Sequence, residues 1–153
     1  MQRQVTLASE ISYAGIGLHS GKNVKMRLCP AAEGTGIVFQ RNDLPGLNKI
    51  QALAEQVTST LRATTISGEA GATVFTVEHL MAALSMMGVD NCLIEMDAPE
   101  PPVMDGSAAV FCELLQRAGL KEQDAERKVY KIKKAFAVYD GDKYVAILPY
   151  DGF

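Results

Sequence analysis

The stretch FTVEHLMAALSMMGVDN, residues 75–91, holds the clearest secondary-structure pattern in the chain. Apolar residues recur at positions i, i+3, i+4 and i+7, which predicts a helix over residues 77–87 with one buried face. Thr76 is expected to cap the N-terminus of this helix, and Gly88 to end it. Such a helix needs a sheet or another helix to cover its apolar face. The apolar face consists of Val77, Leu80, Met81 and Leu84.

A second helix of the same construction is predicted over residues 107–119, SAAVFCELLQRAG. Ser107 is its expected N-cap, and Gly119 is expected to end it. Residues 91–97, NCLIEMD, are predicted to form a strand between the two helices. The apolar stripe of the second helix consists of Val110, Phe111, Leu114 and Leu115.

The first third of the chain is predicted to form strands that run as an antiparallel meander. Its segments alternate apolar and polar residues and are punctuated by glycines. Two amphipathic helices packed on one sheet make a two-layer sandwich, so the predicted fold class is α+β with a mainly antiparallel sheet. The segments are QVTLASEISYAGIGLHSG, NVKMRLCPA and GIVFQR, which begin at residues 4, 23 and 36.

The last part of the chain is expected to open a second domain. Residues 121–128, KEQDAERK, are rich in charge and poor in apolar residues, which predicts a linker over residues 122–127. Residues 128–153 are predicted to form a hairpin around the turn sequence DGD at residues 140–142. Because a lone hairpin is only marginally stable in water, we expect it to begin a second domain after an N-terminal domain of residues 1–121.

Composition limits the classes of function. The chain has 153 residues, of which 48% are hydrophobic and 22% charged, and its net charge is -3 at pH 7. An acidic balance without a basic run argues against a nucleic-acid partner. No apolar stretch approaches a bilayer span and the start lacks a secretory signal, so no transmembrane segment and a cytoplasmic location are predicted. The cysteines are predicted to stay reduced, and they are Cys29, Cys92 and Cys112.

Glu78 and His79 are a polar pair in the first turn of an apolar helix. The partial positive charge of the helix N-terminus favours an ionised Glu78, which can act as a general base, and a neutral His79, which can bind a metal. The alternative is that Glu78 only compensates the helix dipole and His79 is an ordinary polar residue. One histidine is too few for a zinc site, and the helical HExxH zinc motif is absent.

Two further segments hold candidate residues. His19 lies in GIGLHSGK, residues 15–22, which can be a binding loop or a tight turn that carries a surface histidine. Asp105 lies in APEPPVMDGSA, residues 98–108, just before the second helix, where an acidic residue most often caps the helix or stabilises the turn.

These segments together carry a family resemblance. GIGLHSGK, CPAAEGTGIVFQR, LRATTI at residues 61–66, TVEHLMAAL, APEPPVMDGSA and PYDGF occur in an order and spacing that closely resemble the N-terminal half of the UDP-3-O-acyl-N-acetylglucosamine deacetylase family, the zinc amidases of bacterial lipid A synthesis. The resemblance covers the whole chain. It implies a two-domain enzyme, each domain a sheet with two helices similar to domain 2 of ribosomal protein S5, and an active site between the domains.

The resemblance also implies roles for individual residues. His79 would be a ligand of zinc, or of iron in its place, and Glu78 would be the general base for water attack on the N-acetyl carbonyl. Some members have a cysteine where this chain has Ala63. The residues expected to line the cleft or bind substrate are His19, Leu61, Arg62 and Ala63, and Asp105 is expected to be structural.

The family's other zinc ligands, a histidine and an aspartate on one helix, and a further catalytic histidine belong to the second domain, and their motifs are not in this sequence. The chain is therefore expected to be the N-terminal part of a deacetylase that acts on UDP-3-O-acyl-N-acetylglucosamine, inactive without the missing C-terminal domain. Two alternatives stay open. A separate chain or a second copy can complete the enzyme, or the domain can be a non-catalytic binding module.

Overall fold

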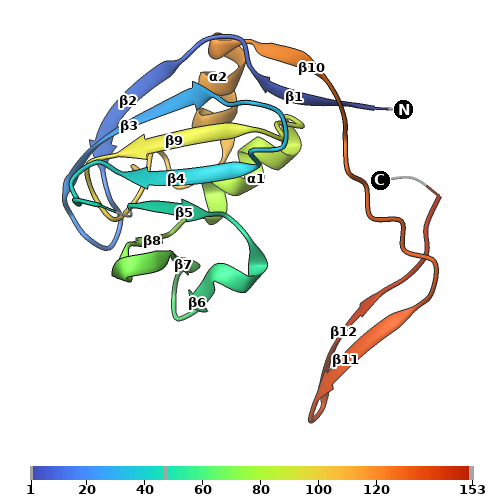
Figure 1. Cartoon of the computed structure of the whole chain (residues 1–153). Helices are drawn as coiled ribbons and strands as arrows, with labels where there is room; N and C mark the ends of the chain where they lie inside the picture. Colours follow the sequence, from blue (N-terminus) through green and yellow to red (C-terminus); the bar gives the residue numbers. More distant parts are fainter. Residues whose placement is uncertain (1, 47, 152–153) are drawn as a thin grey trace.

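A five-stranded sheet lies at the centre of the molecule, with its strands in the order β2-β3-β9-β4-β5 (Figure 1). All neighbouring strands are antiparallel except β4 and β9, which are parallel. The computed structural model describes residues 2–46 and 48–151, so the last two residues of PYDGF lie outside the described part. The strand bounds are Ile11–Ile16 for β2, Asn23–Pro30 for β3, Ile37–Arg41 for β4, Lys49–Gln51 for β5 and Cys92–Met96 for β9.

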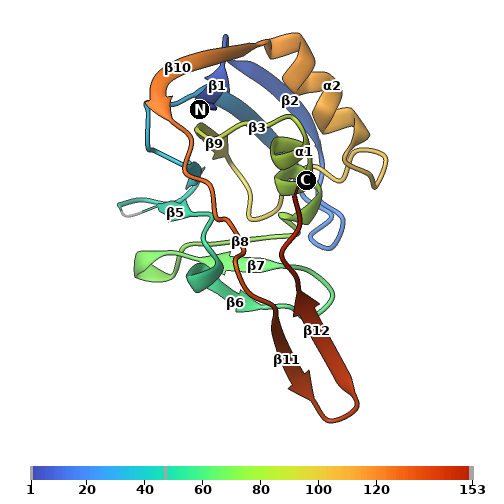
Figure 2. The same ribbon diagram turned by 90° about the vertical axis from the view of Figure 1, so that its right-hand side faces the viewer.

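Both helices pack on the same face of this sheet (Figures 1 and 2). Helix α1 spans Glu78–Met86 and helix α2 spans Ala109–Ala118. Buried and exposed side chains alternate along β3, because one face of the strand meets the core and the other meets solvent. The predicted α+β class, with two helices and mainly antiparallel strands, is confirmed. The core includes Met26, Leu28, Phe39, Leu80, Leu84, Ile94, Phe111 and Leu115.

The start of α1 differs from the prediction. Thr76 does not cap the helix, because its backbone is in the left-handed region, with φ of 57°, and its hydroxyl donates a hydrogen bond to Glu100 Oε1. The N-cap position is Val77, which makes no side-chain cap hydrogen bond. Glu78 and His79 are consequently the first two residues of the helix, still within its first turn. At the other end Gly88, with φ of 69°, confirms the predicted stop.

The start of α2 is displaced in the same direction. The N-cap position is Ala108, one residue after the predicted Ser107. Ser107 still contributes, because its Oγ accepts a hydrogen bond from the Ala109 N–H at 3.1 Å. Gly119, with φ of 72°, ends the helix as predicted, and its N–H donates to the carbonyls of the last turn.

The predicted meander is wrong in its strand order. Strand β9 comes later in the sequence, yet it lies between β3 and β4 and pairs with both. The first strand, β1 at Arg3–Leu7, does not pair with β2 but with β10, which follows α2 in the sequence. Local alternation predicts that a segment is a strand, but it does not identify the partner of that strand.

The segment predicted as a linker is largely a strand. Residues Leu120–Glu126 form β10, which pairs antiparallel with β1. The Glu33 carboxylate accepts hydrogen bonds from the N–H groups of Asp124 and Ala125, and Gln123 binds the buried Asn91. The charged residues fit a strand here because most of its side chains face solvent. The division into two domains stays a prediction.

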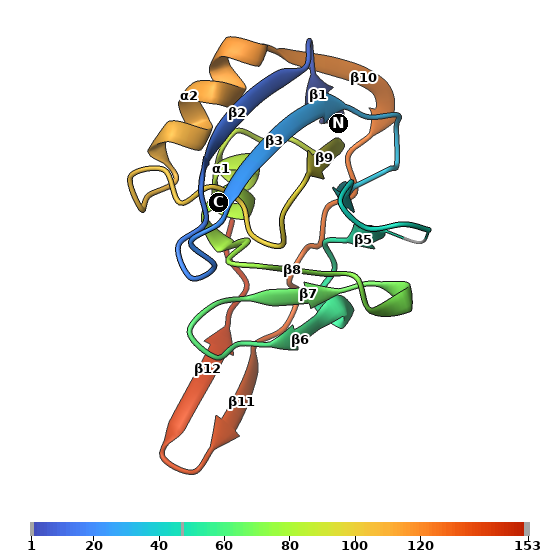
Figure 3. The same cartoon turned by 90° about the vertical axis from the view of Figure 1, so that its left-hand side faces the viewer.

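The remaining strands form two small sheets outside the central one (Figure 3). The predicted hairpin is confirmed as β11 and β12, joined at the turn where Gly141 has φ of 61°, and all three views show it projecting away from the sandwich. No helix in residues 2–46 and 48–151 is long and apolar enough to cross a bilayer. The bounds are Val57–Ser59 for β6, Thr65–Ser67 for β7, Thr73–Phe75 for β8, Phe136–Asp140 for β11 and Lys143–Ile147 for β12, with 3-10 turns at Ala54–Gln56 and Glu69–Gly71.

Candidate functional site

The segments singled out in the sequence meet at the N-terminal end of α1. The Glu78 carboxylate accepts a hydrogen bond from the Thr64 N–H at 3.2 Å, which joins the helix to the loop between β6 and β7. Just before the helix, the Phe75 N–H donates to the carbonyl of Pro99 at 3.0 Å. The polar pair at the start of α1 therefore lies between the loop of residues 61–64 and the proline-rich loop that follows β9.

The glycine-rich loop of residues 15–22 packs against the same proline-rich loop. The Val103 N–H donates to the carbonyl of Ile16 at 2.8 Å. A Cβ atom added at Gly15 would lie 2.9 Å from the Cβ of Pro102, so a larger residue at position 15 would displace one of the two loops. Three loops and one helix start thus form a single contiguous region.

Backbone strain is concentrated in this region. Among the described residues, the non-glycine residues with positive φ are Arg62, Thr76 and Met104, at 61°, 57° and 56°. Arg62 lies in the loop between β6 and β7, Thr76 lies just before α1, and Met104 lies in the proline-rich loop. Non-glycine residues in this region of φ/ψ space cost about 1–3 kcal/mol each and gather at active sites and ligand clamps. Their clustering here supports the assignment of this region as the functional site.

Glu100 is the part of the site that sequence reasoning missed. Its side chain is fully buried, at 0% exposure, between the two flanking prolines Pro99 and Pro101. Its Oε2 accepts the Ser20 N–H at 2.9 Å and its Oε1 accepts the Thr76 hydroxyl at 2.8 Å, while the His19 N–H lies 3.1 Å from both oxygens. In the sequence, this glutamate is marked only by its position between two prolines.

Asp105 lies in the turn that precedes α2. The N–H and Oγ of Ser107 donate to Asp105 Oδ1 at 2.9 and 2.8 Å, so the carboxylate stabilises the turn before α2. These hydrogen bonds lower the pKa of Asp105, and the charge of His79 lowers it further. Glu78, His79 and Ala63 are partly exposed, and three of the other predicted residues are exposed to solvent: His19, Leu61 and Arg62.

Comparisons with known proteins agree with this arrangement of motifs. A family model described as UDP-3-O-acyl N-acetylglycosamine deacetylase matches residues 4–153. The chain belongs to this family. Proteins named UDP-3-O-acyl-N-acetylglucosamine deacetylase are 48% identical over 153 residues in Actinobacillus succinogenes and 52% identical over 146 residues in Myxococcus xanthus. These matches cover 100% and 95% of this chain, and 50% and 46% of the two relatives, so the chain spans about half the length of the curated relatives it matches.

The donor groups of the described residues limit the metal site that this region can form. Within the described residues, no three histidine, cysteine, aspartate or glutamate side chains gather in a group that could hold a metal ion. His79, partly exposed in the first turn of α1, fits as one imidazole ligand. Among the described residues, His79 is therefore a candidate ligand without a cluster of further donors around it.

The pH dependence of stability tests the Glu100 network. Burial raises the pKa of Glu100, but the hydrogen bonds from Ser20, His19 and Thr76 outweigh burial, and the net pKa lies below its usual value. A lowered folded-state pKa contributes stability above the unfolded-state pKa of about 4.3, and that contribution is lost as pH falls through the folded-state pKa. We expect the unfolding free energy to decline in this acidic range.

Urea unfolding at a series of pH values between neutral and strongly acid measures this decline. Glu100→Gln should lack the part of the decline in unfolding free energy that protonation of Glu100 causes. Glu113→Gln, on the exposed face of α2, should keep the whole decline. Identical pH slopes in the parent and Glu100→Gln would contradict the assigned hydrogen bonds.

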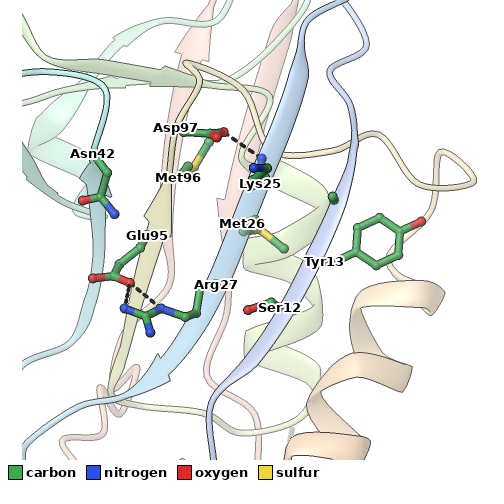
Figure 4. Close-up of a pocket in the computed structure, with 10 residues that line it drawn as sticks. Ser12, Tyr13, Lys25, Met26, Arg27, Asn42, Glu95, Met96 and Asp97 are labelled. Atoms are coloured by element: carbon green, nitrogen blue, oxygen red, sulfur yellow. Dashed lines mark hydrogen bonds and ion pairs between the residues drawn. The ribbon is translucent and has the colours of Figure 1, made fainter.

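A separate hollow of about 520 Å³ lies on the open face of the central sheet (Figure 4). Arg27 donates to Glu95 at 2.6 Å, and the Lys25 N–H donates to Asp97 at 2.7 Å, so the carboxylates in it already have partners. None of its lining residues belongs to the converging motifs, so the hollow is not the candidate site. The lining residues are Ser12, Tyr13, Ala14, Lys25, Met26, Arg27, Asn42, Glu95, Met96 and Asp97.

Proposed function

We propose that this chain is the N-terminal part of a zinc-dependent deacetylase that removes the N-acetyl group of UDP-3-O-acyl-N-acetylglucosamine in lipid A biosynthesis. The observation that carries the proposal is that Arg62, Thr76 and Met104, all with positive φ, lie in the segments that surround Glu78 and His79 at the start of α1. The relatives are named for this substrate, and the chain matches them over about half their length. The likeness of the sandwich to domain 2 of ribosomal protein S5 is part of the same proposal.

The proposed reaction is amide hydrolysis. A water oxygen adds to the acetyl carbon, the C–N bond breaks, and acetate and a free glucosamine amine leave. Zinc, or iron in its place, supplies a Lewis acid that polarises the carbonyl and the water when it is bound. His79 would contribute one ligand, and a C-terminal half outside this chain would contribute the others.

Glu78 would take the proton from the attacking water and pass it to the departing amine. Its position supports this role, because the Thr64 N–H holds one carboxylate oxygen and leaves the other available. His19, Leu61, Arg62 and Ala63 lie on the surrounding loops and would line the cleft, while Asp105 would stabilise the turn beside His79.

Zinc content tests whether this chain holds half of a metal site. After dialysis against metal-free buffer, we expect elemental mass spectrometry to find little zinc on the parent chain, because one imidazole is too few ligands for a stable site. The control is His79→Ala. One zinc per chain that disappears in His79→Ala would mean instead that a second copy or other residues complete the site.

Acetate release tests the function itself. A full-length protein that carries this chain should release acetate from UDP-3-O-acyl-N-acetylglucosamine, and the 153-residue chain alone should not. A full-length protein that binds the substrate and leaves it intact would contradict the proposal and favour the binding-module alternative.

A further inference from the structure

Glu100 joins two segments that carry candidate site residues. Its carboxylate accepts hydrogen bonds from the backbone of His19 and Ser20 in one loop and from the side chain of Thr76, two residues before Glu78. We propose that Glu100 is a positioning residue, whose buried carboxylate holds the His19 loop against the first turn of α1 so that His19, Glu78 and His79 keep one relative geometry. The catalytic consequence rests on the proposed function, whereas the geometric part does not.

The cost of burying this group argues that it does more than fill space. A buried carboxylate is expensive to desolvate unless hydrogen bonds satisfy it. Glu100 is 0% exposed, and its hydrogen-bond partners are two backbone N–H groups and one hydroxyl, with no lysine or arginine among them. An uncharged core would need no such group, so the carboxylate is explained by the donors that it orients.

One of the donors to Glu100 lies in an unfavourable backbone conformation, and the other two lie in a separate segment. Thr76 is β-branched and sits at φ of 57°, which is unfavourable for such a residue. The His19 and Ser20 N–H groups donate to the same carboxylate from the glycine-rich loop. The carboxylate binds both segments at once, and a shift of either segment would break hydrogen bonds to the other.

Gly17 gives independent evidence that this contact is close. A Cβ atom at position 17 would lie 2.5 Å from Glu100 Oε2 and 2.3 Å from Ser20 Oγ, far inside normal contact distance. A side chain at this position would therefore have to displace the loop or the ends of the Ser20 and Glu100 side chains. This accounts for the second glycine of GIGLHSGK, which otherwise has no structural reason, because its φ is not in the left-handed region.

Four substitutions distinguish a positioning role of Glu100 from an effect of its charge and from a general loss of stability. Glu100→Ala removes the acceptor, and Gly17→Ala crowds the contact between the loop and the carboxylate while keeping Glu100 in the sequence. Glu100→Gln is the conservative variant, because its oxygen can accept the two N–H groups while its NH₂ donates to the Thr76 hydroxyl. Glu113→Gln, on the exposed face of α2, is the matched control.

The geometric readout is the set of residual dipolar couplings of residues 17–20, compared with those of α1, in the 153-residue chain. In the parent, Glu100→Gln and Glu113→Gln, both segments should fit one alignment tensor. In Glu100→Ala and Gly17→Ala the couplings of residues 17–20 should no longer fit the alignment tensor of α1. The couplings of the core strand β9 should stay as in the parent and show that the protein is folded. Loop couplings that still fit in Glu100→Ala would overturn the proposal.

The catalytic readout is kcat and KM for acetate release by the full-length protein. A displacement of about 1 Å can cost about 100-fold in rate, so Glu100→Ala and Gly17→Ala should lose kcat on that order, with Glu100→Gln close to the parent. A displaced loop with unchanged kcat would overturn the catalytic part. A parent without activity would contradict the proposed function, and the dipolar couplings would still decide whether Glu100 positions the loop.

Discussion

Replacing Glu78 with glutamine in the full-length protein should lower acetate release by about 10²- to 10⁴-fold, the range that general acid–base catalysis contributes. Glutamine has the shape of glutamate, and its side-chain oxygen can still accept the Thr64 N–H that holds Glu78 at 3.2 Å. The change therefore removes the proton acceptor and leaves the helix start in place. The loss should appear in kcat, because substrate binding does not need the proton transfer.

The measurement is steady-state acetate release together with metal content and thermal unfolding of the same samples. Metal content and unfolding temperature should match the parent, since His79 and the core are unchanged. Glu113→Gln makes the same chemical change on the exposed face of α2 and should leave kcat as it is. If Glu78→Gln released acetate at the parental rate, the general-base role would be wrong.

Replacing Leu84 with alanine should destabilise the domain by about 2–5 kcal/mol, the usual cost of emptying a buried leucine site. Leu84 is 1% exposed and belongs to the core between α1 and the sheet. Total stabilities of single domains are only about 5–15 kcal/mol, so this one substitution should remove a large share. Urea unfolding followed by circular dichroism measures the loss.

Met86→Ala is the matched control on the same helix. Met86 is 77% exposed, and its truncation should change the unfolding free energy by no more than about 0.5 kcal/mol. Both variants place alanine in α1, so differences in helix propensity are small. Equal losses in the two variants would contradict the buried face of α1 described above.

Local patterns in the sequence were sufficient for the helices and the hairpin. The apolar period predicted helices over residues 77–87 and 107–119, and the structure has them at Glu78–Met86 and Ala109–Ala118. Gly88 and Gly119 end them, and the turn sequence DGD joins β11 to β12. Each of these features depends on residues within a few positions of one another, so sequence order carries the information.

Strand pairing could not be predicted in the same way. β9 lies between β3 and β4, although it follows both in the sequence. β10 pairs with β1, although the two strands are far apart in the sequence. The charge of β10 suggested a linker, because a strand that faces solvent on most of its surface has the same composition as an exposed connection. Its backbone pairing with β1, which is remote in the sequence, makes it a strand, and the Glu33 carboxylate accepts two further N–H groups from it.

In the candidate site, too, the local features could be predicted from the sequence and the long-range contacts could not. By itself the sequence determined that Glu78 and His79 begin an amphipathic helix and that this helix carries a family motif. Only the tertiary structure decided the left-handed conformation of Thr76 and the burial of Glu100, whose partners Thr76 and His19 lie 24 and 81 residues away in the chain. Helix periodicity is local, whereas a buried carboxylate is stable only where distant donors meet it.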